Sequence, residues 1–97
     1  MSSFIKLTEI QEVSQRWPSN IKKYMLDEII INTSTIAALR EGSSFKKEMK
    51  MHKGWPEGLD ERIILTKILL NFNGEGNIIY AVGDLENITK KIGVSNG

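Results

Sequence analysis

Apolar residues alternate with polar ones, or gather in short β-branched runs, along most of this chain. Alternation puts one set of side chains on each face of an extended segment, and β-branched residues favour that conformation. The pattern predicts five strands, at Phe4–Ile10, Lys22–Ile31, Ile36–Glu41, Arg62–Asn73 and Ile78–Val82. Between the second and third, Asn32–Thr35 carries side chains that can bond to nearby backbone, which predicts a turn or one turn of 3₁₀ helix.

A helical periodicity follows the last predicted strand. Apolar residues three and four positions apart, ending with Ile88 and Ile92, predict a helix over Leu85–Ile92. Asp84 can cap its first turn, because a carboxylate there accepts a backbone N–H that has no partner inside the helix. Gly93 follows the last periodic residue and is predicted to end the helix.

The strand predicted at Arg62–Asn73 has apolar side chains on both faces. In so small a domain, such a strand must bend around a core or bury its second face against another subunit. Gly74–Asn77 is predicted to turn the chain back into the last strand. The sequence therefore predicts a mainly β (α+β) domain, either a small SH3/Sm-like barrel or a strongly bent antiparallel sheet of about five strands with a C-terminal helix. It also predicts a homo-oligomer.

Residues 42–61 have no clear periodicity. A basic half, Phe45–Lys53, is joined to an acidic half by Gly54-Trp55-Pro56-Glu57-Gly58. Long irregular segments are uncommon in small domains, so two alternatives remain open. The segment is a functional or mobile insertion, or Ser44–Met51 forms a short helix capped by Ser43 or Ser44.

The order of elements resembles that of the FlbD proteins, a family of small bacterial and phage proteins typified by those of flagellar operons. The matching pieces cover about half of the chain and are Ile5-Lys6-Leu7-Thr8, Ile31-Asn32-Thr33-Ser34-Thr35-Ile36, Thr66–Phe72 with Ile78–Val82, and Leu85–Ile92. The length of 97 residues predicts a single domain, residues 1–97. The resemblance implies that it is a small barrel-like β domain with a C-terminal helix and without catalytic residues. Residues 11–27 and 42–61 lack a counterpart in the family pattern, so we interpret them as insertions that carry this protein's own function.

Composition and charge exclude several classes of protein. The 97 residues include 13 basic and 12 acidic side chains, and a net charge of +1 gives no general attraction to nucleic acid or anionic membrane. The chain has no cysteine and one histidine, which excludes disulfides, thiolate zinc sites and His-rich metal sites. The N-terminus lacks a secretory signal pattern, and no apolar run reaches the roughly 20 residues of a membrane helix. We expect a cytoplasmic protein without metal, cofactor or membrane contact.

Two sets of side chains are candidates for binding. Trp17, Phe45 and Trp55 are predicted to contact a protein partner, because large rings in loops are enriched at interfaces. The alternative role of the two tryptophans is to cover an open end of the barrel. A basic set can contact phosphates of a nucleic acid or nucleotide, with Phe45 and Trp55 as stacking platforms. This set is Lys46, Lys47, Lys50 and Lys53. The alternative is a solvated loop or helix face. The acidic residues that follow would compete with a ligand for these lysines.

No segment carries a recognisable catalytic motif. Gly74-Glu75-Gly76 lacks the Lys-Ser/Thr of a P-loop, and no serine has a Gly-x-Ser-x-Gly context. We expect a non-catalytic protein–protein interaction or regulatory module of bacterial or phage origin, of which an inhibitor of a host protein is one instance. The alternative is nucleic-acid or nucleotide binding through residues 45–53. Residues 44–58 are predicted to be dispensable for folding and needed for binding.

Overall fold

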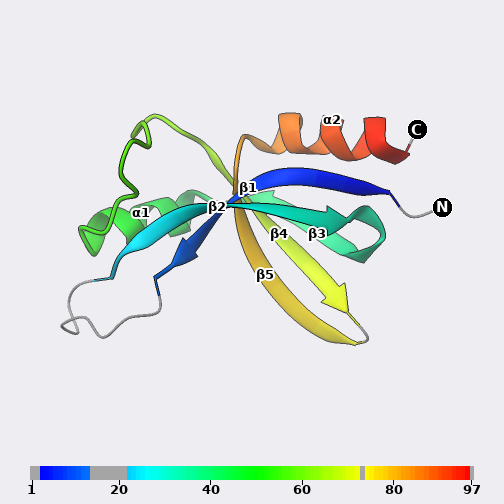
Figure 1. The fold of residues 1–97 in the computed structure, drawn as a ribbon, viewed down its shortest axis with the longest axis horizontal. Coiled ribbons are helices and arrows are strands. Elements are labelled where there is room, and N and C mark those ends of the chain that lie inside the picture. The colour runs from blue at the N-terminus through cyan, green and yellow to red at the C-terminus, as the bar shows by residue number, and fades with distance from the viewer. Residues whose placement is uncertain (1–2, 14–21, 73, 97) are drawn as a thin grey trace.

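A computed structural model describes residues 3–13, 22–72 and 74–96. Its strands are β1 (Phe4–Glu12), β2 (Tyr24–Asn32), β3 (Ile36–Glu41), β4 (Leu65–Phe72) and β5 (Glu75–Val82). Two α-helices and one 3₁₀ turn accompany them: α1 (Ser43–Met51), α2 (Leu85–Asn96) and η1 (Thr33–Thr35). The strands form one antiparallel sheet in the order β2-β1-β5-β4-β3 (Figure 1). The mainly β class, the five antiparallel strands and the C-terminal helix are therefore confirmed.

The sheet is strongly bent, because its two edge strands are consecutive in the chain. β2 and β3 lie at opposite edges, yet only the three residues of η1 join them. Four Cα–Cα steps reach at most about 14 Å, so the edges must approach each other at this corner. Figure 1 shows β2 running into the η1 turn and β3 returning from it. In the part of the chain that the structure describes, β2 and β3 are not paired, so the sheet does not close into the SH3/Sm-like barrel.

The η1 corner is built from hydrogen bonds that its own side chains make. Asn32 Oδ1 accepts from the Ser34 N–H at 3.0 Å and from the Ser34 hydroxyl at 2.9 Å. The Thr35 hydroxyl donates to the Asn32 carbonyl at 2.7 Å. These bonds replace strand pairing locally, as the polar run Asn32–Thr35 predicts.

The face of the sheet against which α2 packs holds the larger of two cores, which we call the inner core. It combines alternate residues of four strands with one residue of α2, namely Ile5, Leu7, Ile31, Ile68, Leu70, Ile79, Ala81 and Ile88. Ile68 and Ala81 are fully buried. Side chains two residues apart share a face of a strand, so this core accounts for one face only of β1, β4 and β5.

The opposite face carries a second cluster, the outer core, made of Ile10, Tyr24, Met49 and Leu65. Leu65 and Ile68 lie on opposite faces of β4, and their side chains are 2% and 0% exposed. Met49 of α1 is also 0% exposed. The second apolar face predicted for this strand is thus covered in part by α1, from the same chain.

Some boundaries differ from the sequence prediction. β4 begins at Leu65 instead of Arg62, because a turn precedes it: the Ile63 N–H donates to the Asp60 carbonyl, and Arg62 binds the Asp60 carboxylate at 2.8 Å. This hydrogen bond lowers the pKa of Asp60. The predicted turn at Gly74–Asn77 is shorter, because Glu75 already pairs with Phe72.

Both helices also correct a prediction. The short helix proposed for Ser44–Met51 forms, but its N-cap is Gly42 and no side chain caps it, so the prediction of a Ser43 or Ser44 cap was wrong. α2 continues past Gly93 to Asn96, so Gly93 does not end it. Gly93 is exposed and has no positive φ, which allows the helix to run through it.

We expect the docking of α2 to be visible in two substitutions. Ile88 is 1% exposed in the inner core, so Ile88→Ala should lower the free energy of unfolding by about 2–4 kcal/mol through a cavity. Asp84 Oδ1 accepts the Asn87 N–H at 2.7 Å, so Asp84→Ala should cost about 1 kcal/mol through the lost cap. Urea unfolding measures both, and an Ile88→Ala midpoint like that of the parent would show that α2 is not docked.

Candidate binding surfaces

Phe45 takes part in an aromatic stack that attaches α1 to the sheet. Its ring lies parallel to that of Tyr80, with centroids 3.9 Å apart and an interplanar angle of 7°. The Tyr24 ring meets it edge-on at 5.5 Å. Burial raises the pKa of the Tyr24 hydroxyl, and the charges of Glu48 and Glu12 raise it further. The sequence prediction named Phe45 as a partner contact but did not name Tyr24 and Tyr80. Both tyrosines lie in strands, and their positions in the sequence do not show which helix covers them.

Trp55 is likewise engaged within the chain. Its indole N–H donates to the Leu59 carbonyl at 2.7 Å, and the half-buried ring packs against the outer core. Lys50 Nζ lies 5.7 Å from the centre of the same ring, a cation–π arrangement. Trp17, the third predicted partner contact, lies outside the described residues. The role of Trp55 at an interface stays a prediction.

The predicted basic set is divided between structural and solvent-facing positions. Lys46 donates to the Ile63 carbonyl at 2.8 Å, and this bond ties α1 to the turn before β4. Lys47 is exposed. Lys53 and Trp55 line a small hollow of about 290 Å³ together with Lys23 and Glu57. The carboxylate of Glu57 offsets part of the positive charge in this hollow.

The C-terminal end of α1 is fixed against the start of β2. Lys53 has φ 55°, and its N–H donates to the Lys50 carbonyl while the Gly54 N–H donates to that of Met49. This pair of bonds is a Schellman motif, which ends the helix with a left-handed residue. The Gly54 carbonyl then accepts the Tyr24 N–H at 3.2 Å. A Cβ atom on Gly54 would lie 1.6 Å from the Lys22 carbonyl oxygen, so only glycine fits here.

A hollow opens on the outer face beyond the area that α1 covers; we call it the outer hollow. Its volume is about 670 Å³, and Ala37 of β3, Leu69 of β4 and Ile78 of β5 line it. Leu69 and Ile78 are cross-strand partners, and Ile78 is 48% exposed. None of the described residues that line the hollow is charged. This is the half of the second apolar face that α1 leaves open.

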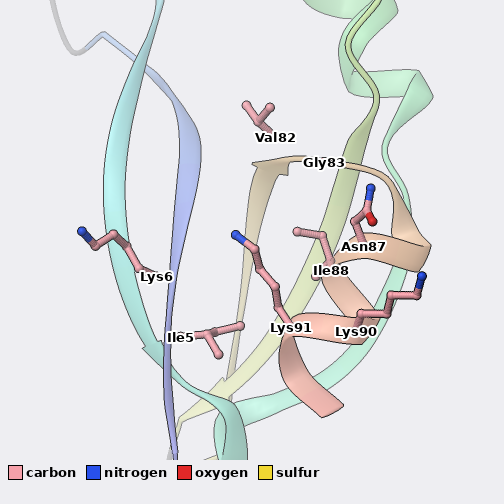
Figure 2. A pocket seen from close by; sticks show the side chains of 8 residues that line it. All are labelled: Ile5, Lys6, Val82, Gly83, Asn87, Ile88, Lys90 and Lys91. Atoms are coloured by element: carbon pink, nitrogen blue, oxygen red, sulfur yellow. The ribbon is translucent and has the colours of Figure 1, made fainter. Parts of the chain in front are cut away.

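A second cavity, which we call the β1–α2 groove, lies between the first half of β1 and α2 (Figure 2). Its volume is about 770 Å³, with Ile5, Val82 and Ile88 as apolar lining. Figure 2 shows Lys91 reaching from α2 into the groove, whereas the side chain of Lys6 points away from it. The sequence pattern gave no signal of this groove.

A metal cluster and a membrane-spanning helix are both absent from the described residues. Within residues 3–13, 22–72 and 74–96, no three acidic, histidine or cysteine side chains lie together where they could hold a metal ion. No helix among these residues has the length and apolar character needed to cross a membrane. Comparison with protein-family models, curated proteins and solved structures gave no match. The resemblance to FlbD proteins therefore stays a prediction.

Proposed function

We propose that this chain is a non-catalytic protein-binding module that works as a homo-oligomer, with the outer hollow as its contact surface. The observation that carries the proposal is the uncovered apolar face of β4 and β5. α1 covers one end of this face, at Leu65, and Ile78 is left 48% exposed at the other. Exposed apolar side chains that line a cavity are typical of interaction sites.

A second copy of the chain fits this surface better than a strongly charged partner. A twofold axis brings the same patch of both copies together, so any charge in the patch would meet itself. The described lining of the outer hollow is uncharged, which removes that repulsion. β3, at the rim of the hollow, is also an edge strand, and its outer backbone groups have no strand partner among the described residues.

Sedimentation velocity at micromolar concentration tests the proposal, with Ile78→Glu as the disrupting variant. The parent should sediment as a dimer or larger, and Ile78→Glu should raise the dissociation constant at least about tenfold by placing a carboxylate in the apolar contact. Ile30→Glu is the matched control, because Ile30 is a β-strand isoleucine that is 65% exposed outside the hollow. It should leave association unchanged.

Two outcomes would contradict the proposal. A parent that stays monomeric throughout the micromolar range would remove self-association. If Ile30→Glu dissociated the oligomer and Ile78→Glu did not, the contact between copies would lie on β1 and β2 instead of the outer hollow. Circular dichroism of both variants must match that of the parent, so that a change in association is not a change in folding.

A further inference from the structure

The β1–α2 groove lies beside the part of β1 that extends past the end of β5, which stops at Val82. β1 pairs with β2 at nine positions, from Phe4–Asn32 to Glu12–Tyr24. With β5 it pairs, among the described residues, at one position only, Glu9 with Ala81. The groove opens on the N-terminal side of that contact, where Ile5 of β1 faces Ile88 of α2 (Figure 2).

The edge of β1 that faces the groove has no strand beside it. Between Ile5 and Thr8, strand pairing within the described residues is with β2 alone. Alternate N–H and C=O groups of a strand point to each side, so half of those in this stretch point away from β2. Such an edge is a template for an extended segment, which adds to the sheet through main-chain hydrogen bonds.

The charge around the groove is positive. Lys91 projects into it and forms no ion pair within the part of the chain that the structure describes. Lys90 also lines the groove, and its Nζ lies 3.4 Å from Glu86 Oε1. This ion pair is exposed and therefore weak. No acidic residue is among the described lining. A second copy of the same groove would be repelled, whereas a carboxylate would be attracted.

We propose that the β1–α2 groove binds an extended acidic peptide, which adds as a strand along Ile5–Thr8 of β1. The peptide lays an apolar side chain over the floor of the groove, where Ile5 and Ile88 are 8% and 1% exposed, and presents a carboxylate to Lys91. Side chains two residues apart point to the same side of a strand, so the recognised pattern is an acidic and an apolar residue separated by one residue. The described lining of the groove has no aromatic ring for base stacking, so its chemistry favours a peptide over a single-stranded nucleic acid.

Fluorescence anisotropy with a labelled synthetic peptide tests this assignment. The peptide has about ten residues, enough to run along β1, with glutamate and valine at alternating even positions and threonine at the rest. We expect Lys91→Glu to weaken binding at least about tenfold at low salt, because it reverses the charge that faces the carboxylate. Lys47→Glu, at an exposed site on α1, is the matched control and should change affinity less than about twofold.

Backbone methylation separates strand addition from simple charge attraction. Two versions of the peptide carry N-methyl groups on alternate amides, one on the odd residues and one on the even residues. Strand addition requires that at least one version loses binding about tenfold or more, since methylation removes donors from the paired edge. Equal binding by both versions and by the parent peptide would exclude strand addition.

Further outcomes overturn the proposal as a whole. A peptide with lysine in place of glutamate that bound as well would exclude recognition of a carboxylate. If the glutamate peptide did not bind, but an oligonucleotide or an anionic vesicle bound in a way that depended on Lys91, the groove would be a site for nucleic acid or for membrane instead of a peptide. The Ile78→Glu variant should bind the peptide as the parent does, so this site and the self-association site are tested separately.

Discussion

Gly54→Ala is expected to lower the free energy of unfolding by about 3–5 kcal/mol, a large effect for a single methyl group. The added Cβ would lie 1.6 Å from the Lys22 carbonyl oxygen and 2.9 Å from the Lys23 Cα. These are backbone atoms, so no side-chain rotation can relieve the overlap. The loop after α1 must separate from β2, and the Tyr24 N–H then loses its bond to the Gly54 carbonyl.

Equilibrium unfolding in urea measures this effect, and Gly93→Ala provides the control. A Cβ on Gly93 meets nothing within 4 Å, and this residue lies inside α2. Alanine there should raise stability by about 0.5–1 kcal/mol, because glycine has the greater backbone entropy in the unfolded chain. If Gly54→Ala unfolded at the parent's midpoint, the end of α1 would not be docked on β2.

Replacing residues 44–58 with a short Gly-Ser linker should abolish cooperative folding. The sequence alone favours the opposite result, because loop closure depends weakly on length. The structure shows why that expectation should fail: these residues include Met49, which is 0% exposed, and they cover Leu65 and Ile10, which are 2% and 4% exposed. Each large apolar side chain that becomes exposed costs about 1.5–3 kcal/mol, which together approaches the whole stability of a small domain.

A pair of substitutions in the same helix tests the same point in smaller steps. Met49→Ala should destabilise by about 2–5 kcal/mol, because it leaves a cavity in the outer core. Met51→Ala, two residues later at a side chain that is 72% exposed, should change stability by less than about 0.5 kcal/mol. Thermal and urea unfolding monitored by circular dichroism would show both. A linker variant that unfolds in one sharp transition would instead mean that α1 is a removable addition.

The two proposed surfaces differ in chemistry and should therefore select different partners. The described lining of the outer hollow is uncharged, which suits contact with an identical patch. The β1–α2 groove presents Lys91 without an acidic neighbour in its described lining, which suits an acidic segment. The basic set on α1 is less available than the sequence indicates, since Lys46 is bonded to the Ile63 carbonyl and Lys50 lies over Trp55.

Local pattern in the sequence determined the secondary structure well. The third predicted strand, Ile36–Glu41, has the observed bounds, and the polar run Asn32–Thr35 forms the predicted 3₁₀ turn. Asp84 caps α2 as predicted. These features depend on side chains a few residues apart along the chain, and such neighbours come into contact independently of the tertiary structure.

Tertiary structure alone decided which faces are covered and which are left open. Alternation shows that Leu65 and Ile68 lie on opposite faces of β4, but it cannot show that Met49 covers one of them and Ile88 closes the core on the other. Among the described residues β1 pairs with β5 only at Glu9, and the groove depends on this contact between segments 72 residues apart (81 minus 9). Such pairings are selected by packing and by the bend at η1, and these involve the whole chain at once.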